Sequence, residues 1–469
     1  NNGLWKYAFD VTLKAKWRDN YNAYTYEFVR DEEGSIIGVE ILSYNANERI
    51  VKIPDSFLKY PVISIASLAF ANNSSIEKIV VPNTVTTIGE AAFAYNVNLK
   101  EVEIPVSVTS FKANLLLGCT SLEEITIPGH YDQTLPYLFG NEVKNVPATL
   151  TIINYARGTT TINSTIWKSN VTNYSVTLYL PDDMTEIPSN AFNGAKYLTS
   201  VVIPYGVTKL GDAAFKASGI TYLEVPDSVT SIGGSCFSDA KSLKSIKLSN
   251  NITSIAGSLF LNCTALVSLV IPEGVKSIGT NAIANTYALK YIYLPDSLTS
   301  IYDWAFWGSG ISEIRWGRGM KNVGWQVLGS TSKLTTISFH NSMTSIAGQA
   351  FIYTGIKCVT IPKSLTSISN DNPIPTSITV YTDLTSKPSG WKVDFKNIVW
   401  GATLSNDGSY VVSIEKTEET VSGLRSPTRY GYTFGGWYTT PDFTGEKYTS
   451  IDDAPYGTLY AKWDLNVGY

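Results

Sequence analysis

A repeat with a period of about 23 residues runs through most of this 469-residue chain. Each unit contains a short apolar strand that ends at a proline position, as at Pro204 and Pro226, and a phenylalanine eleven residues later, as at Phe215 and Phe237. A period of this length is typical of a solenoid, in which each unit stacks on its neighbours rather than folding around a private core. The repeat therefore predicts one elongated hydrophobic interior, and it favours binding over a broad surface rather than catalysis.

The columns of the repeat predict a role for each part of a coil. The segment Leu-x-x-Ile-x-Ile ends in the alternation of a strand with one buried face, and the proline after it donates no ladder hydrogen bond. Stacked in register, these strands should form one curved parallel sheet, with the Val-x-x-Ile and phenylalanine columns filling the interior from the opposite wall. A small residue three places after the phenylalanine, such as Ala240 or Cys263, should pack where neighbouring coils come closest. We therefore expect a mainly β solenoid.

Some segments depart from the repeat. Shorter units contain Gly219, Gly310 or Gly355, where glycine should permit a tighter turn. The stretch 140–179 is rich in Thr and Asn and predicts an irregular coil, and 31–34 predicts a hairpin turn.

The motif Ile-Pro-x-x-Val-x-x-Ile-Gly-x-x-Ala-Phe is specific, and residues 82–93 and 226–237 match it nearly throughout. Over about residues 50–381 the chain resembles the BspA-like leucine-rich-repeat proteins of bacterial cell surfaces. The resemblance implies a leucine-rich-repeat solenoid, adhesion to host matrix or to other cells, and a closing cap at 387–391 and 398–401, where the last coil would otherwise expose its apolar face.

The repeat stops at about residue 403. The motifs at 431–438 and 459–463 resemble the internalin-type B repeat (Listeria–Bacteroides repeat), a small β-grasp-like module, and 11–17 resembles the last strand of the same module. We therefore expect five parts, which are a remnant of an upstream B-type repeat at 1–17, an N-terminal cap of the solenoid at 18–50, the BspA-like solenoid at 51–382, a C-terminal cap and linker at 383–402, and an internalin-type B repeat at 403–465.

Composition argues against several classes of function. The net charge is −4 with 16% charged residues and no basic patch, which argues against a nucleic-acid partner. The sequence contains no stretch of about 20 apolar residues, so it predicts no segment that inserts into a membrane. The two histidines have no second ligand at metal spacing, and no phosphate loop or nucleophile elbow is present. We therefore expect no metal, no cofactor and no enzymatic activity. Of four cysteines, Cys358 falls on an outward strand position and is predicted to be an exposed thiol.

An aromatic concentration, rich in Tyr, Trp and Arg, is the candidate ligand-binding site. By the strand alternation, Tyr291, Tyr293 and Arg315 should point outward, and these are the residue types of interface hot spots. The alternative is that several of these side chains simply pack between coils. The predicted site consists of Tyr222, Tyr291, Tyr293, Trp304, Trp307, Arg315, Trp316 and Arg318.

The leading functional hypothesis is a monomeric, non-catalytic adhesion and interaction scaffold, extracellular on a bacterial cell surface, that binds a host matrix protein or another cell-surface protein. Two alternatives remain open. Flat aromatic side chains also stack on sugar rings, which would make the protein a glycan-binding surface protein. A structural stalk or spacer with no ligand of its own is the other.

Overall fold

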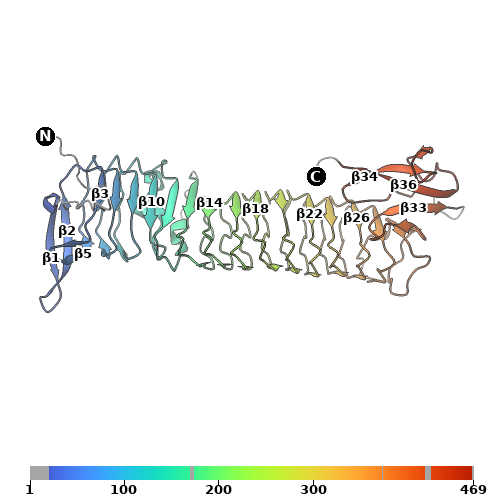
Figure 1. Cartoon of the computed structure of the whole chain (residues 1–469), viewed down its shortest axis with the longest axis horizontal. Helices are drawn as coiled ribbons and strands as arrows, with labels where there is room; N and C mark the ends of the chain where they lie inside the picture. The colour runs from blue at the N-terminus through green and yellow to red at the C-terminus, as the bar shows by residue number, and fades with distance from the viewer. Residues whose placement is uncertain (1–20, 169–173, 372, 418–423, 467–469) are drawn as a thin grey trace, which may run out of the picture. The chain divides into compact units, whose positions relative to one another are not determined.

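The computed structural model describes residues 21–168, 174–371, 373–417 and 424–466 (Figure 1). The predicted remnant at 1–17 lies outside the described residues. The chain divides into two compact units, the first made of Asn1–Ile125 with Pro136–Thr149 and the second of Thr126–Leu135 with Leu150–Tyr469. No described helix is long and apolar enough to cross a lipid bilayer.

Short strands dominate both units. Up to residue 149 the elements are η1 (Tyr21–Ala23), β1 (Tyr24–Arg30), β2 (Ile36–Tyr44), β3 (Ile50–Lys52), β4 (Ser56–Phe57), β5 (Tyr60–Ile65), β6 (Lys78–Val80), β7 (Thr87–Ile88), β8 (Glu101–Glu103), β9 (Ser110–Phe111), β10 (Glu124–Ile127), η2 (Leu135–Phe139) and η3 (Val143–Asn145). The next elements are β11 (Ile152–Tyr155), η4 (Ser164–Trp167), β12 (Val176–Tyr179), β13 (Glu186–Ile187), β14 (Leu198–Val202), β15 (Lys209–Leu210), β16 (Tyr222–Glu224), β17 (Ser231–Ile232), β18 (Ser245–Lys247), β19 (Ser254–Ile255), β20 (Ser268–Leu269), β21 (Ser277–Ile278) and β22 (Tyr291–Tyr293). The remaining elements are β23 (Ser300–Ile301), β24 (Glu313–Arg315), β25 (Asn322–Val323), β26 (Thr336–Ser338), β27 (Ser345–Ile346), β28 (Cys358–Ile361), β29 (Ser367–Ile368), β30 (Thr379–Thr382), β31 (Asn397–Val399), β32 (Thr403–Leu404), β33 (Val411–Lys416), β34 (Tyr432–Tyr438), β35 (Lys447–Tyr448) and β36 (Gly457–Leu465).

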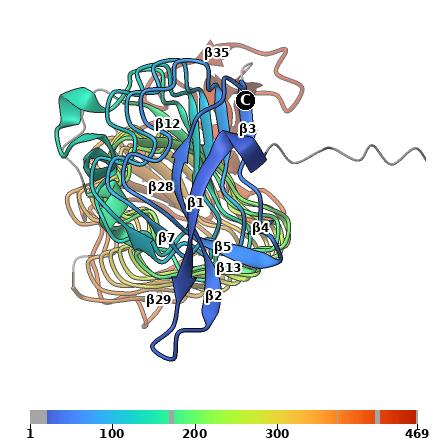
Figure 2. The same ribbon diagram turned by 90° about the vertical axis from the view of Figure 1, so that its left-hand side faces the viewer.

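An antiparallel hairpin begins the first unit. Strands β1 and β2 pair through the predicted turn at 31–34, where the Gly34 amide donates to the Asp31 carbonyl at 3.0 Å. Strand β2 then pairs in parallel with β5, and the Tyr44 ring stacks on Phe70 at 5.3 Å between centroids. In Figure 2, β1 and β2 lie in front of β5 and β7. The hairpin thus covers apolar side chains of the first coil, as the end of a solenoid requires.

Each coil contributes strands to two parallel rows rather than to one sheet. In the second unit the expected Leu-x-x-Ile-x-Ile strands pair in register, so that Tyr222 lies beside Ser245 and Ser245 beside Ser268. The Val-x-x-Ile segment forms a second row of two-residue strands, in which Ile255 pairs with Ile278. The sequence predicted the first row, and it placed the second segment only as filling of the interior.

The phenylalanine column forms a continuous buried row from Phe192 to Phe260 in the second unit. The rings of Phe192, Phe215, Phe237 and Phe260 stack on one another at centroid distances of 5.1, 5.7 and 5.6 Å. Trp167 belongs to the irregular coil predicted at 140–179, and its ring extends the row by an edge contact with Phe192 at 5.9 Å. The predicted alignment of the column is therefore confirmed within this unit, and from Phe192 to Phe260 identical rings one coil apart fill the interior.

The backbone bends sharply on both sides of each phenylalanine. Ala213 and Ala217, two places before and after Phe215, both have a φ of 53°, a left-handed conformation that costs energy for residues other than glycine. The short units use glycine for another reason. A Cβ on Gly310 would lie 2.0 Å from the Tyr287 carbonyl oxygen of the preceding coil. Glycine is therefore required there by the close approach of two coils, and not by a turn that only glycine can make.

The C-terminal module is a five-stranded antiparallel sheet in the order β32-β33-β36-β34-β35. Trp437 of β34 is buried at its centre. One cluster of buried side chains joins the module to the last coils, because Cys358, Tyr381 and Val399 of the solenoid belong to the same apolar core as Trp437. Figure 1 shows β33, β34 and β36 beside the end of the strand row that contains β26. A leucine-rich-repeat type of solenoid followed by a small β module is the fold class that the repeat predicts.

Candidate binding surface

The outward face of the first strand row presents exposed aromatic side chains. Strands β16 and β22 alternate exposed, buried and exposed positions. Tyr222, Tyr291 and Tyr293 have 49%, 43% and 44% of their surface exposed. Register places Tyr293 beside Arg315 of the next coil, whose guanidinium carbon lies 5.7 Å from the tyrosine ring centroid, within the range of a cation–π contact.

The C-terminal module covers the end of this outward face. All four positions of β28 and of β30 are buried, although strand alternation points two of the four outward. Cys358 is 2% exposed, so the predicted exposed thiol is wrong. Its outward position is right, but the apolar core of the module lies over it. Burial raises the pKa of this thiol, which keeps it protonated.

Polar contacts fix the module against the solenoid. The Gly431 amide donates to Glu313 Oε1 at 2.8 Å, and the Asn341 amide donates to the Asp407 carbonyl at 2.6 Å. The Tyr381 hydroxyl donates to the Arg425 carbonyl. The sequence motifs identified the module but gave no sign that it folds back over the sheet. The outward positions of β28 and β30 hold Cys358, Thr360, Thr379 and Tyr381, and Thr and Tyr also occupy outward positions in uncovered coils, so these residues gave no signal.

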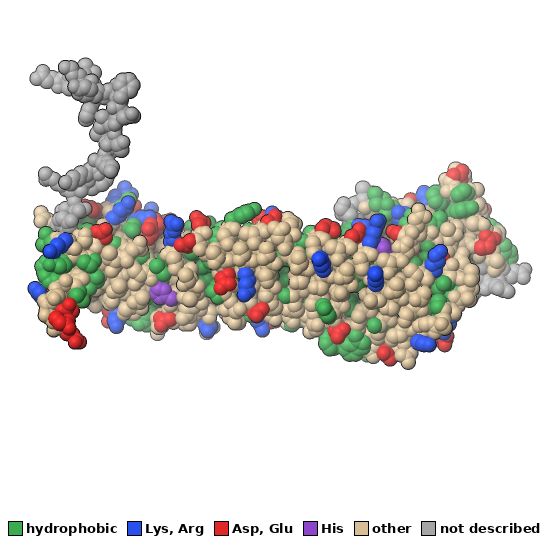
Figure 3. All heavy atoms as spheres, turned by 60° about the horizontal axis from the view of Figure 1, so that its bottom comes forward, with side chains coloured by type: hydrophobic (Ala, Val, Ile, Leu, Met, Phe, Trp, Pro, Cys, Tyr) green, Lys and Arg blue, Asp and Glu red, His purple; other side chains and the backbone are tan. Residues whose placement is uncertain are grey.

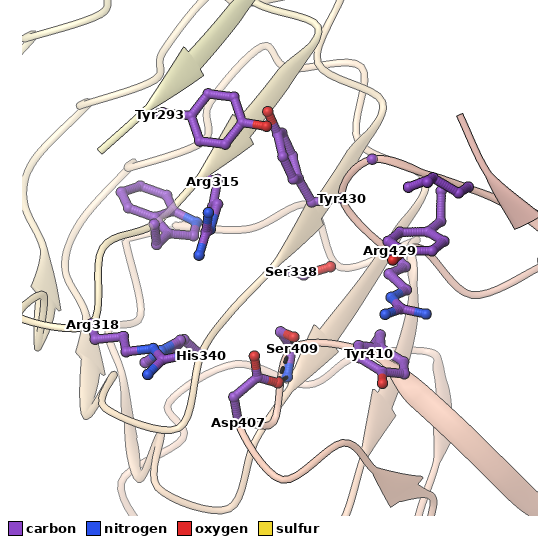
Figure 4. Close-up of a pocket in the computed structure, with 14 residues that line it drawn as sticks. Tyr293, Arg315, Arg318, Ser338, His340, Asp407, Ser409, Tyr410, Arg429 and Tyr430 are labelled. Atoms are coloured by element: carbon purple, nitrogen blue, oxygen red, sulfur yellow. Dashed lines mark hydrogen bonds between the residues drawn. The ribbon is translucent and has the colours of Figure 1, made fainter. Parts of the chain in front are cut away.

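A cavity of about 360 Å³ lies where the module meets the outward face, and we call it the junction cavity. Figure 4 shows Tyr293, Arg315, Arg318 and His340 of the solenoid on one side, with Tyr410 and Arg429 of the module opposite and Asp407 below. Tyr430 of the module lies against Tyr293, with the two ring centroids 4.9 Å apart. Its lining residues are Tyr293, Arg315, Trp316, Arg318, Ser338, His340, Asp407, Ser409, Tyr410, Arg429, Tyr430, Gly431, Tyr432 and Leu465.

The structure separates the predicted site into several places. Tyr293, Arg315, Trp316 and Arg318 line the junction cavity, whereas Tyr291 lines an adjacent hollow with Arg429. Tyr222 lies farther along the sheet, in a third hollow of about 360 Å³ that we call the sheet groove. Its other lining residues are Ser200, Val201, Val202, Ile203, Tyr205, Leu223, Glu224, Val225, Pro226, Asp227 and Lys247.

Three tryptophans differ from the prediction of an exposed patch. Trp316 is only 4% exposed, because it occupies the buried column before the turn and stacks on Phe339 at 6.2 Å. Trp304 and Trp307 are half-buried and follow β23 of the second row, so they line none of the three hollows. Trp304 packs against the Trp325 ring at 5.2 Å. These tryptophans therefore pack between coils, which was the alternative to an exposed binding patch.

Two titratable side chains of the junction cavity were not predicted to belong to the site. Burial lowers the pKa of His340, and its Nδ1 is 3.2 Å from the Ser342 amide, which donates to it. Burial acts to raise the pKa of Asp407, but hydrogen bonds from Ser405 and Ser409 outweigh it and lower the pKa. At neutral pH the cavity therefore contains a neutral imidazole and an ionised carboxylate.

The cysteines of the solenoid interior have a packing role and no reactive one. Cys119, Cys236 and Cys263 are buried free thiols, and burial raises the pKa of each to about 12. A thiolate is the reactive form, so these side chains act as small hydrophobic residues. Within the described part of the chain, no group of three His, Cys, Asp or Glu side chains is placed to hold a metal ion.

Comparison with known proteins gives a family for both parts of the chain. The model of the BspA type leucine-rich repeat region matches residues 37–174, 160–287 and 254–372, and that of the Listeria–Bacteroides repeat domain matches residues 404–462. No curated protein matches.

Among solved structures, the chain is similar to a leucine-rich cell surface protein from Faecalibacterium prausnitzii, with 21% identity over 82% of this chain and 95% of the other and a TM-score of 0.35. It is also similar to a leucine-rich-repeat protein from Bacteroides ovatus, with 20% identity, coverage of 81% and 100%, and a TM-score of 0.37. The repeat matches extend over more than half of the chain, and on that ground the chain belongs to the BspA-type leucine-rich-repeat family and carries a Listeria–Bacteroides repeat domain at its C-terminal end.

Proposed function

We propose that this chain is a non-catalytic interaction scaffold of a bacterial cell surface that adheres to a protein partner, either of the host matrix or of another cell. Membership of the BspA-type family supports a surface scaffold. The observation that carries the proposal is a set of exposed apolar side chains along the first strand row, on β14, β16 and β22 or just after β14 and β20. These are Val202, Tyr205, Tyr222, Val270, Tyr291 and Tyr293.

The geometry of this row suits a protein interface. Stacked strands hold their side chains on a rigid surface, so little conformational entropy is lost when a partner binds. The sheet groove places Tyr205 and Tyr222 together beside the Glu224–Lys247 ion pair, whose nitrogen and oxygen are 2.6 Å apart. Aromatic side chains at the centre with charged groups beside them are the usual composition of an interface hot spot.

On the face that Figure 3 shows, charged side chains are mostly scattered singly over uncharged polar surface. Interfaces are depleted of charge at their centres and enriched in Tyr. We therefore place the partner on the outward strand face, where Tyr222, Tyr291 and Tyr293 present exposed rings.

The test compares two pairs of tyrosine variants. Tyr205→Ala with Tyr222→Ala removes exposed rings from the sheet groove, and Tyr302→Ala with Tyr353→Ala removes two exposed rings from outside the strand row. Binding to immobilised matrix proteins and to whole cells should weaken for the first pair by about 2 kcal/mol, or about 30-fold in Kd, and stay unchanged for the second. Equal binding by both pairs would remove the strand face from the proposal and favour a spacer.

A further inference from the structure

The junction cavity is built by two parts of the fold that are far apart in the sequence. Tyr293, Arg315 and His340 come from successive coils, whereas Asp407 and Arg429 come from the module. A volume of about 360 Å³ is within the range of sites for small ligands. The docking contacts at Glu313 and Asn341 hold both walls in place, so the cavity is preformed.

Two residues that line this cavity carry buried N–H groups with no hydrogen-bond partner among the residues that the structure describes. The two groups are Nε1 of Trp316 and Nε2 of His340, on side chains that are 4% and 8% exposed. The Ser342 amide donates to Nδ1 of His340, so a neutral imidazole carries its proton on Nε2 and is a donor there. A buried donor left unsatisfied costs about 1–3 kcal/mol, and native structures contain few of them. Both groups therefore point to a ligand with acceptor oxygens.

Positive charge is concentrated in the same place. Arg315, Arg318 and Arg429 line the cavity, and Asp407 is the one carboxylate in its lining, in a chain whose net charge is −4. Arg318 also lies 3.9 Å from Asp296 outside the lining, which leaves Arg315 and Arg429 as the cations best placed for a ligand. The Arg429 guanidinium is held between Tyr410 and Tyr432, at 3.9 and 3.6 Å from their ring centroids. An arginine fixed in this way loses little freedom when it binds a carboxylate through two parallel hydrogen bonds.

Asp407 narrows the class of anion. Its ionised carboxylate would repel a dianion such as phosphate, but it accepts hydrogen bonds from hydroxyl groups, as it already does from Ser405 and Ser409. Ser338 and Ser409 add hydroxyls to the lining, and the tyrosine rings add apolar surface. The lining thus matches a ligand with one carboxylate, several hydroxyls and an apolar ring face.

We propose that the junction cavity binds an acidic sugar, a pyranose that carries a single carboxylate, at the end of a glycan. The arginines bind the carboxylate, while Trp316, His340 and Asp407 bind ring oxygens and hydroxyls. The cavity shares Tyr293 with the exposed row but contains neither Tyr205 nor Tyr222 of the sheet groove, so it can be tested apart from the protein partner proposed above. It gives the C-terminal module a function that the solenoid alone lacks.

The experiment uses the whole chain and follows the indole N–H signals of its tryptophans by NMR during titration. Sialyllactose and glucuronic acid are the acidic probes, and lactose and glucose are their neutral counterparts. Inorganic phosphate and a short peptide with a free C-terminal carboxylate distinguish other anions. Acidic sugars should shift the Trp316 signal, assigned by its loss in Trp316→Phe, and should leave that of Trp325 in place. Neutral sugars should leave both in place.

The variants locate the site. Arg315→Gln should lower the affinity for sialyllactose about 10- to 100-fold, since it removes a charged hydrogen bond, whereas the matched change Arg157→Gln at an exposed arginine should not. Tyr205→Ala with Tyr222→Ala should leave sugar binding intact, which separates this proposal from the protein-binding one. Four results would each overturn the proposal of an acidic-sugar site. They are equal binding of acidic and neutral sugars, tighter binding of phosphate or peptide, no binding at millimolar sugar, and binding that Arg315→Gln does not affect.

Discussion

Phe237→Ala should destabilise the solenoid locally and strongly. The Phe237 ring is fully buried and stacks between Phe215 at 5.7 Å and Phe260 at 5.6 Å, with interplanar angles of 13° and 9°. Truncating a buried phenylalanine to alanine costs about 3–5 kcal/mol, because the transfer energy is lost and a cavity remains. Phe237→Leu should cost about 1.5 kcal/mol or less, since buried leucines at 116 and 328 already occupy this column in other coils.

Native-state hydrogen exchange measures both the size and the extent of this effect. The Phe215 amide donates to the Cys236 carbonyl at 2.8 Å and the Phe237 amide to the Leu259 carbonyl at 3.0 Å, so both report on contacts between coils. A loss of about 4 kcal/mol lowers their protection about 1,000-fold. In a solenoid the loss should stay near the altered coil, and protection of the Phe93 amide should change little. An equal loss at Phe93, or equal effects of Ala and Leu, would refute the coil-by-coil argument.

Two further predictions test the close packing of coils and the docking of the module. Gly310→Ala should lower the free energy of unfolding by more than about 2 kcal/mol, because the new Cβ would lie 2.0 Å from the Tyr287 carbonyl oxygen. Gly194→Ala should lower it by about 1 kcal/mol, because Gly194 has a φ of 79° but open space around it. Urea denaturation of the two variants measures the difference. Cys358 should react slowly with a thiol reagent in the intact chain, because the module buries it. Trp437→Ala, in the core of the module, should accelerate the labelling of Cys358 but not that of Cys236 in the solenoid interior. Equal acceleration of both thiols would mean that the chain unfolds generally and that the module does not simply undock.

The repeat predicts the coil because the same physical demand recurs in every unit. Each unit has a strand with one buried face, then a residue that donates no ladder hydrogen bond, and an aromatic ring eleven places later. A chain of such units has few other ways to pack. Phe215 and Phe237 were placed in one column from spacing alone, and they stack in one row with Phe260. The second strand row was missed because a two-residue strand such as Ser254–Ile255 is too short to show an alternation.

The candidate site was harder to predict, since its residues come from two segments whose docking no local pattern specifies. Alternation placed Tyr293 and Arg315 correctly on the outward face. It also placed Cys358 there correctly, but it carries no information about what covers that face. Asp407 and Arg429 lie in segments that look like ordinary turns of a small sheet, and only their position over the solenoid gives them a shared cavity.

A solenoid alone offers a ligand a broad, gently shaped surface, because stacked identical coils repeat the same relief at every step. Small ligands need concave sites that surround them on several sides. Here the concavity arises where the repeat ends, because the module that shields the last coils also overhangs the outward strand positions just before them. Without the module, the charged side chains of β24 would be exposed on an open sheet. Beneath the module they form one wall of a partly enclosed site, where electrostatic attraction is stronger than in bulk water. Capping the last coils therefore also supplies the second wall of a ligand site, and a related chain with other residues at 407 and 429 would keep the cap but change the ligand.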